Sequence, residues 1–328
     1  FASWRDRVLT VRMRVSFSSR HPRGHRGRCP SFASWRDRVL TVRMRVSFSS
    51  RHPRGHRGRC PSFANWTCAP GRKRVGFQID LRLQTPEFSI VAENEDFLLV
   101  DKPAHLIVHP TQPGDATTLL DGLEALCIYE LANGGQLSLI NRLDRETSGI
   151  VLVAKHKAAA RELGIAMERR KFRKSYHAIV WGWPEEDDFL IDAPLSRKGE
   201  LEPSPIWVKQ WVHPEGKESR TRFSVEKRFK RNTTNGSRFS LVKCFPETGR
   251  MHQIRVHAQH SGHSIVGDKI YGPDENCYLE FIETGWTEKL EKLLLLNRQA
   301  LHASGFGWKE ENWECPLPPD LEKFLTET

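Results

Sequence analysis

The chain has 328 residues, with 51 basic and 40 acidic side chains and a formal net charge of +11. It contains no apolar run that approaches the roughly 18 to 20 residues needed to span a membrane, which argues against an integral membrane protein. Its seven cysteines are scattered and include no CxxC pair, which argues against a disulfide framework and favours a reducing, cytoplasmic location.

The first 62 residues are an exact tandem repeat, because residues 1–31 recur letter for letter as residues 32–62. Structural repeats keep only their core positions alike, so an identical pair indicates a recent duplication of DNA. The two copies hold 16 Arg and 2 Asp, which leaves 35 basic and 38 acidic residues in the rest of the chain. The excess of positive charge therefore belongs to the repeat. Any surface for nucleic acid elsewhere must come from local clustering of basic residues.

Three interpretations of residues 1–62 are open: a translated non-coding repeat upstream of the true start, a disordered basic arm, or a mitochondrial targeting peptide. The first is favoured, because copies that contain Arg but no Lys suggest GC-rich repeat DNA. A secretory signal is disfavoured because Arg12 and Arg14 interrupt the apolar stretch. Residues 63–89 are expected to be a short lead-in segment, and residues 90–328 a single main domain.

Strand-like runs dominate the main domain, and a few segments with helical spacing lie between them. No GxGxxG motif or P-loop suggests a nucleotide cofactor. Strands close in sequence with interspersed helices predict an α+β fold with a mixed, mainly antiparallel central sheet and flanking helices. The expected strands are 97–100, 150–154, 176–183, 219–228 and 238–245, the last two joined by a polar loop at 230–236, and the expected helices are 118–131, 157–170 and 251–260.

Residues 141–155, NRLDRETSGIVLVAK, place one carboxylate, Asp144, between Arg142 and Arg145. Nearby positive charges lower the pKa of a carboxyl group and keep it ionised. The apolar stretch that follows predicts a buried strand, so Asp144 would lie on a loop anchored by rigid structure, where catalytic groups often occur. Asp144 is thus a candidate nucleophile or base. A salt-bridge cluster at the start of a strand is the alternative.

A second polar cluster occupies residues 247–271. Zinc sites usually combine close His pairs with Cys or carboxylate ligands, and HExxH is absent, so we predict no metal site. On a helix that begins near residue 251, His252 and Arg255 share one face, and Arg255 could reach a carboxylate elsewhere in the fold. A solvated surface Arg is the alternative. The cluster contains four histidines: His252, His257, His260 and His263.

Taken together, five segments in order resemble the RluA-type family of RNA pseudouridine synthases. The resemblance covers roughly residues 90–318 and lies wholly outside the repeat. The segments are DKPAHLIVHP at 101–110, RLDRETSGIVLVAK at 142–155, KSYHAIVWG at 174–182, ETGRMHQIRVHAQHSGHSIVGDKIYG at 247–272 and LHASGFGW at 301–308.

The resemblance implies an RNA-binding cleft across the sheet and isomerisation of uridine to pseudouridine in RNA, without a cofactor. Asp144 matches the catalytic aspartate of the family, and Arg255 would pair with it. Tyr176 would lie beside the target base, with a core aromatic as the alternative. Arg142 would fill the space left by a flipped base or contact a phosphate. Further RNA contacts are expected from Arg145, Arg250 and His252.

Two departures from the family pattern are visible. Asn141 stands where the family commonly has His before the RLD triplet, and we interpret it as supporting structure or an RNA contact. Many relatives also carry an S4-like domain in front, for which residues 63–90 are too few, so the chain resembles the short form. Ribosomal and transfer RNA are both plausible substrates, and a monomer is expected. The alternatives are a non-catalytic RNA-binding protein or chaperone and a metal-dependent hydrolase.

Overall fold

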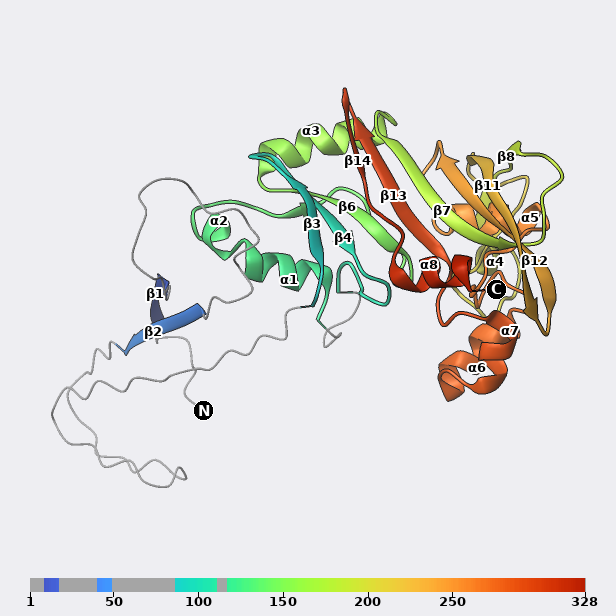
Figure 1. Ribbon diagram of the computed structural model, residues 1–328. Coiled ribbons are helices and arrows are strands. Elements are labelled where there is room, and N and C mark those ends of the chain that lie inside the picture. Colours follow the sequence, from blue (N-terminus) through green and yellow to red (C-terminus); the bar gives the residue numbers. More distant parts are fainter. Residues whose placement is uncertain (1–8, 18–39, 49–85, 111–116, 328) are drawn as a thin grey trace, which may run out of the picture. The chain divides into compact units, whose positions relative to one another are not determined.

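A computed structural model describes residues 9–17, 40–48, 86–110 and 117–327 (Figure 1). The chain forms two units, Phe1–Leu83 and Gln84–Thr328. In the first, β1 (Leu9–Phe17) and β2 (Leu40–Phe48) pair antiparallel. Each strand is the same nine residues from one copy of the repeat. The other residues of the predicted segment 1–62, and residues 63–85 of the predicted lead-in segment 63–89, lie outside the described part of the chain.

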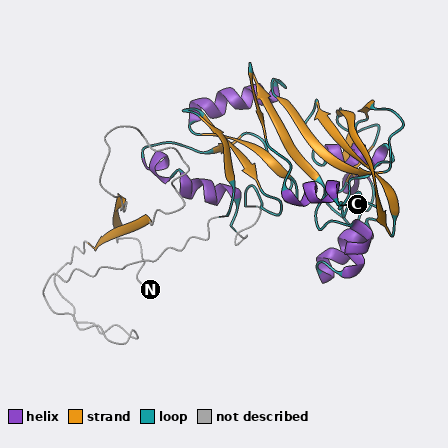
Figure 2. Ribbon diagram, viewed as in Figure 1, coloured by secondary structure: helices purple, strands orange, loops and turns teal. Residues whose placement is uncertain are grey.

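The second unit is built on a ten-stranded sheet (Figure 2). Its strands follow the order β3-β4-β6-β13-β7-β12-β11-β8, with β5 paired to β6 and β14 paired to β13. All its described pairs are antiparallel except β13 with β6, so the predicted α+β class with a mixed, mainly antiparallel sheet is confirmed. The strands are β3 (Ser89–Glu93), β4 (Phe97–Lys102), β5 (Ser138–Leu139), β6 (Ser148–Ala154), β7 (Arg173–Trp181), β8 (Asp188–Asp192), β11 (Arg220–Thr233), β12 (Gly236–Pro246), β13 (Leu301–Trp308) and β14 (Glu311–Glu314).

Helices flank this sheet, and a separate hairpin pairs β9 (Leu195–Arg197) with β10 (Gln210–Val212). Among the described residues, no helix is both long and apolar enough to cross a membrane. The helices are α1 (Leu119–Leu126), α2 (Ile128–Ala132), α3 (Lys157–Glu168), α4 (Lys198–Leu201), α5 (Gln253–His260), α6 (Asn276–Thr284), α7 (Glu288–Leu294) and α8 (Pro319–Thr326).

Strand β13 joins the two halves of the sheet, because it lies between β6 of one half and β7 of the other. Its parallel pairing with β6 matches His302 to Ser148 and Ala303 to Gly149. Gly149 has a positive φ of 109°, and a Cβ atom there would lie 2.3 Å from the carbonyl oxygen of Ala303. Only glycine accepts both that backbone conformation and that close approach.

Strands β4 and β6 are buried on both faces, which explains their nearly continuous apolar sequences. Successive side chains of a strand point to opposite faces. Leu98 packs in a cluster with Leu119 of α1, whereas its neighbour Leu99 packs in another with Leu163 of α3. The two helices accordingly cover opposite faces of this half of the sheet (Figure 1).

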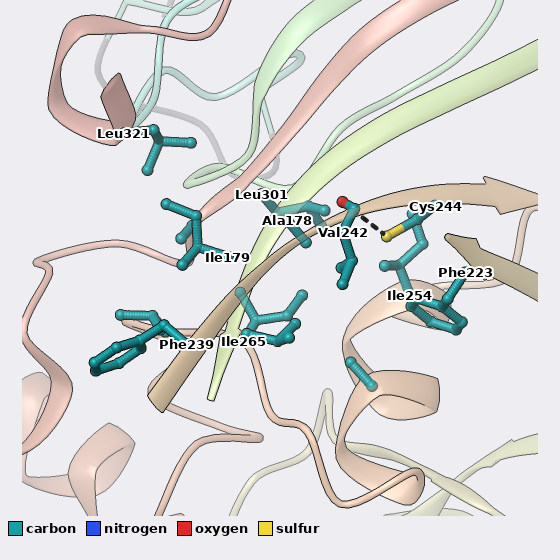
Figure 3. Close-up of a cluster of buried hydrophobic side chains, with 14 of the residues drawn as sticks. Ala178, Ile179, Phe223, Phe239, Val242, Cys244, Ile254, Ile265, Leu301 and Leu321 are labelled. Atoms are coloured by element: carbon teal, nitrogen blue, oxygen red, sulfur yellow. Dashed lines mark hydrogen bonds between the residues drawn. The ribbon is translucent and has the colours of Figure 1, made fainter. Parts of the chain in front are cut away.

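The other half of the sheet packs its core against α5 and α8. Figure 3 shows Ala178 of β7 and Val242 of β12 in one buried cluster with Ile254 of α5. Leu321 of α8 belongs to the same cluster. Because Ile254 is anchored in this core, α5 is fixed relative to the strands. This anchoring determines where the neighbouring side chains of α5 can reach.

Most of the predicted elements are confirmed, with two corrections. The predicted helix 118–131 is divided into α1 and α2, because the backbone turns at Cys127 and brings its thiol into the core beside α1. The predicted loop 230–236 is a tight turn, since β11 and β12 extend to Thr233 and from Gly236. Asn235 holds this turn by donating to the carbonyl oxygen of Lys292 at 2.8 Å.

Candidate active site

A cleft of about 600 Å³ opens beside the centre of the sheet. Its walls come from the loop before β6, the end of α3, β7 and the segment that leads into α5. Residues far apart in the sequence therefore meet around one cavity. Six of the seven predicted site residues line it: Arg142, Asp144, Tyr176, Arg250, His252 and Arg255.

The loop that carries Asp144 is held to β6 by Asn141. The amide oxygen of Asn141 accepts a hydrogen bond from the backbone N–H of Leu152 at 2.6 Å, and its amide nitrogen donates to the carbonyl oxygen of Ile150 at 3.3 Å. The side chain thus pairs with β6 as a neighbouring strand would. This geometry supports the structural role expected for Asn141, although the side chain also lines the cleft.

The Asn141→Ala variant is expected to lower the free energy of unfolding by about 1 to 3 kcal/mol, because it leaves the buried N–H of Leu152 without an acceptor. Urea denaturation measures the change. The matched control is Asn133→Ala, which removes an exposed amide hydrogen bond to the carbonyl of Tyr129 and is expected to change the stability little. Equal effects of the two variants would contradict the proposed support of the loop.

Arg255 connects two carboxylates at the base of the cleft. It donates from Nη1 to Asp144 Oδ2 at 2.8 Å, and from Nε and Nη2 to the two oxygens of Asp268 at 2.6 and 2.9 Å. Asp268 is fully buried and also accepts from the backbone N–H groups of Ile270 and Tyr271. The bidentate contact with Asp268 fixes the guanidinium, and the third donor of Arg255 is directed at Asp144.

Asp144 remains ionised although it lies in a partly buried place. Burial by itself would raise the pKa of its carboxyl group, but the charges of His252 and Arg255 and the hydrogen bond from Arg255 outweigh burial and lower that pKa. His252 cannot supply a charge at neutral pH, because burial and the nearby Arg255 lower its pKa to about 4. Arg255 is therefore the permanent counter-charge. Its side chain is 5% exposed, whereas that of Asp144 is 31% exposed.

Tyr176 belongs to the wall of the cleft and to the hydrophobic core at once. It lies on β7 opposite Cys244 of β12 and packs against two of the core clusters. Burial and the charge of Asp144 raise the pKa of its phenol, so the group carries its proton at neutral pH. The two roles considered for Tyr176 from the sequence are compatible in this position.

The cleft is locally basic. Its lining includes five basic side chains, Arg142, Arg170, Lys174, Arg250 and Arg255, and three acidic ones, Asp144, Glu168 and Glu247. Arg145 does not line it, and its backbone carbonyl accepts a hydrogen bond from the buried Lys102 at 3.1 Å. Basic side chains are thus clustered at the cleft, although the chain outside the repeat has slightly more acidic than basic residues.

Two residues that contribute to the site, Asp268 and Gln299, were not predicted from the sequence as site residues. Asp268 lies in the second polar cluster, where no sequence pattern assigned it a role, yet it fixes Arg255. Gln299 donates to Thr147 at 2.8 Å and approaches Asp144 Oδ2 at 3.4 Å. No local pattern identifies Gln299, because it lies between elements and contacts the loop only in the folded chain.

The four histidines of the second polar cluster do not converge on one point. His257 donates from Nε2 to the carbonyl oxygen of Ala193 at 3.0 Å, and its Nδ1 lies 2.9 Å from Oγ1 of Thr221. His263 donates to the carbonyl oxygen of Trp181. Within the part of the chain that the structure describes, no three His, Cys, Asp or Glu side chains form a group that could hold a metal ion.

Comparison of the sequence with known proteins gives consistent matches. Residues 96–260 match the family model of RNA pseudouridylate synthases. The chain is 33% identical over 256 residues to the uncharacterized RNA pseudouridine synthase YlyB of Bacillus subtilis, a match that covers 75% of each chain. It is 32% identical over 247 residues to the ribosomal large subunit pseudouridine synthase D of Escherichia coli, covering 72% of this chain and 69% of that protein.

The fold has a solved counterpart in the human RNA pseudouridylate synthase domain containing 4. That structure matches with a TM-score of 0.55 and 23% sequence identity, covering 72% of this chain and 91% of the human chain. At this level of identity the similarity concerns the fold.

Proposed function

The chain belongs to the RNA pseudouridylate synthase family, and we propose that it converts specific uridines to pseudouridine in structured RNA with Asp144 as the catalytic carboxylate. One observation carries the proposal. Asp144 is ionised, held at 2.8 Å by a buried arginine, and still 31% exposed to the cleft. A carboxylate that only supported the fold would have no need of access to a cavity of this size.

The chemistry requires an ionised carboxylate beside the nucleotide. The reaction breaks the glycosidic C–N bond, rotates the base and rejoins it to the sugar through carbon. Asp144 can attack the sugar C1′, add to the base, or remove the 2′ proton, and each route begins from its charged form. Tyr176, which lines the same cleft, is proposed to lie beside the target base.

The basic residues of the cleft support the binding of RNA. A uridine must leave its stack before its glycosidic carbon can be reached, at a cost of a few kcal/mol. We propose that Arg142 takes the place of the flipped base and that Arg250 contacts the backbone. Arg145 lies outside the lining, so we propose for it a phosphate contact beyond the cleft. The enzyme is proposed to act as a monomer without a nucleotide cofactor.

Ribosomal RNA is the substrate that we favour, since the E. coli relative is named for the large ribosomal subunit. The purified protein should release tritium from transcripts labelled at uridine C5, because C5 loses its hydrogen when it bonds to the sugar. We expect faster release from large-subunit ribosomal RNA than from transfer RNA. Preference for transfer RNA would overturn the substrate assignment alone, and no release from total cellular RNA would favour a non-catalytic binding protein.

A further inference from the structure

A chain of three groups leads from the β9–β10 hairpin to Asp144. The backbone N–H of Gln210 donates to the phenol oxygen of Tyr271 at 2.7 Å. The same oxygen lies 2.8 Å from Nδ1 of His252, and Nε2 of His252 lies 3.8 Å from Oδ2 of Asp144. Tyr271 is fully buried, so this arrangement is part of the interior and not a surface contact.

The direction of these hydrogen bonds follows from what each group can donate. A backbone N–H only donates, so the phenol oxygen of Tyr271 accepts from Gln210. Among the described residues the phenol hydrogen has no acceptor other than Nδ1 of His252, which must be unprotonated to accept it. A neutral imidazole carries one hydrogen, and with Nδ1 as acceptor that hydrogen resides on Nε2. The contact with Tyr271 therefore selects one of the two tautomers.

Both partners are neutral at physiological pH. Burial and the positive charge of Arg255 lower the pKa of His252 to about 4. Burial raises the pKa of the Tyr271 phenol. Neither group gains or loses a proton in the neutral range, so the tautomer selected by Tyr271 persists.

The two rings are also fixed in place. The guanidinium of Arg255 lies 4.9 Å from the centre of the Tyr271 ring, a cation–π distance. The rings of His252 and Tyr271 meet edge to face, with centres 5.5 Å apart. His252 has a left-handed backbone conformation, with φ of 56°, which a residue other than glycine seldom adopts without support from its surroundings.

The Nε2–H of His252 has no protein acceptor within hydrogen-bonding distance among the described residues. Its separation of 3.8 Å from Asp144 exceeds the range of a hydrogen bond. His252 lines the cleft together with Asp144, so the donor faces the space that a nucleotide would occupy. An oxygen of a nucleotide placed against Asp144 would find both groups beside it.

We propose that Tyr271 is a positioning residue that holds His252 in its Nε2–H tautomer, so that His252 donates a hydrogen bond to an oxygen of the target nucleotide at Asp144. The inference rests on the proposed function, because it takes Asp144 as the reacting group. It assigns to Tyr271 a role that requires no contact with RNA. It also makes His252 a donor whose partner is the substrate.

Two substitutions of His252 test its donor atom, Nε2, separately from its acceptor atom, Nδ1. Gln places an amide nitrogen near the position of Nε2, whereas Asn places an amide oxygen near the position of Nδ1 and leaves nothing at Nε2. We expect His252→Gln to keep kcat within about tenfold of the wild type and His252→Asn to lower it about a hundredfold, as for a misplaced or missing group at the reacting centre. Equal kcat values for the two variants would overturn the role of the donor.

Tyr271→Phe tests the positioning role. We expect kcat for tritium release to fall about tenfold with KM within about twofold, because the ring of His252 loses its orientation while the RNA surface is unchanged. In ring-¹⁵N NMR spectra, with the signals of His252 assigned by their loss in His252→Asn, the wild type should show one Nε2–H tautomer and Tyr271→Phe a mixture. The control is Tyr278→Phe, a partly buried tyrosine of the same hydrophobic cluster, which should leave both readouts unchanged.

All variants are assayed well below the lowest melting temperature of the set, so that lost stability does not enter kcat. Wild-type kcat and a single tautomer in Tyr271→Phe would overturn the inference. Asp144→Asn separates this outcome from failure of the proposed function. An inactive Asp144→Asn with an unaffected Tyr271→Phe refutes only the positioning role, whereas an active Asp144→Asn refutes the proposed function itself.

Discussion

Replacing Asp144 with Asn is expected to abolish tritium release from RNA labelled at uridine C5, with a loss of about ten thousandfold or more, as for removal of a catalytic nucleophile or base. The amide has nearly the same shape as the carboxylate but can neither attack a carbon nor accept a proton at neutral pH. The fold should persist, because Arg255 keeps its bidentate partner Asp268. The measurement is release per enzyme in single-turnover conditions, with circular dichroism to verify folding.

The control for this variant is Asp96→Asn. Asp96 is an exposed carboxylate that contacts His156 at 3.0 Å, far from the residues that line the cleft, and its loss should leave tritium release unchanged. Binding of RNA by Asp144→Asn, measured by filter retention, should stay within about threefold of the wild type, because the basic residues of the cleft remain. Release that survives in Asp144→Asn would remove Asp144 from the reaction.

Replacing Arg255 with Leu is expected to destabilise the protein by about 3 to 5 kcal/mol, because it leaves the buried carboxylate of Asp268 and the carboxylate of Asp144 without their counter-charge. Arg255→Lys should also destabilise the protein, but less than Arg255→Leu, since an ammonium group keeps the charge but cannot bridge two carboxylates with a planar fork. The control is Arg228→Leu, whose partner Asp187 is 73% exposed and whose loss should cost less than about 1 kcal/mol.

The effect of Arg255→Leu should depend on pH with a defined sign. The pKa values of Asp144 and Asp268 are lowered in the folded protein, so their ion pairs stabilise it fully above the ordinary carboxyl pKa of about 3.9 and lose that contribution as the pH falls through the folded values. The difference between wild type and variant should therefore be largest at neutral pH and shrink in acid. A difference that grows on acidification would contradict the assigned charges.

Arg255→Leu should also change the acid limit of activity. Without its counter-charge, Asp144 takes up a proton at a higher pH, so the acid limb of the rate profile should move toward neutrality. If the acid limb stays at the wild-type position, a group other than Arg255 keeps Asp144 ionised.

The sequence alone pointed to Asp144 and Arg255 as residues of the candidate site, but its charge pattern indicated other residues as the source of the positive charge beside Asp144. Arg142 and Arg145 flank Asp144 in the chain, and they were expected to keep it ionised. In the folded protein the permanent positive charge that lowers its pKa is that of Arg255, because His252 is uncharged at neutral pH. Arg255 is 111 residues away along the chain. Neighbours in sequence on a turning loop need not point the same way, and no local pattern records where a distant helix will place its side chains.

The contributions of Asp268, Tyr271 and Gln299 could not be predicted for the same reason. Each acts through a contact between segments that meet only when the sheet is complete. The strands and helices that were predicted have clear hydrophobic patterns, a continuous apolar run in β4 and helical spacing in α3. By contrast, β13 contains Gly305 and Gly307, which obscure its strand character. Side chains of β7 fill the space beside them, since a Cβ atom at Gly305 would lie 2.2 Å from Oγ of Ser175.

The place of β13 in the sheet has a consequence for how the protein is made. The ribosome synthesises β3, β4 and β6 first and β7, β8, β11 and β12 next, and the strand that joins these two groups, Leu301–Trp308, is synthesised after both of them. Asp144 precedes β6 of the first group, whereas Tyr176 lies on β7 of the second group and Arg255 on α5, which follows β12. Until β13 is inserted, β6 and β7 expose unpaired edges that invite misassembly. The cleft, which Leu301 helps to line, is thus completed only after β13 has been synthesised, and a translation product that stops before this strand is expected to be inactive.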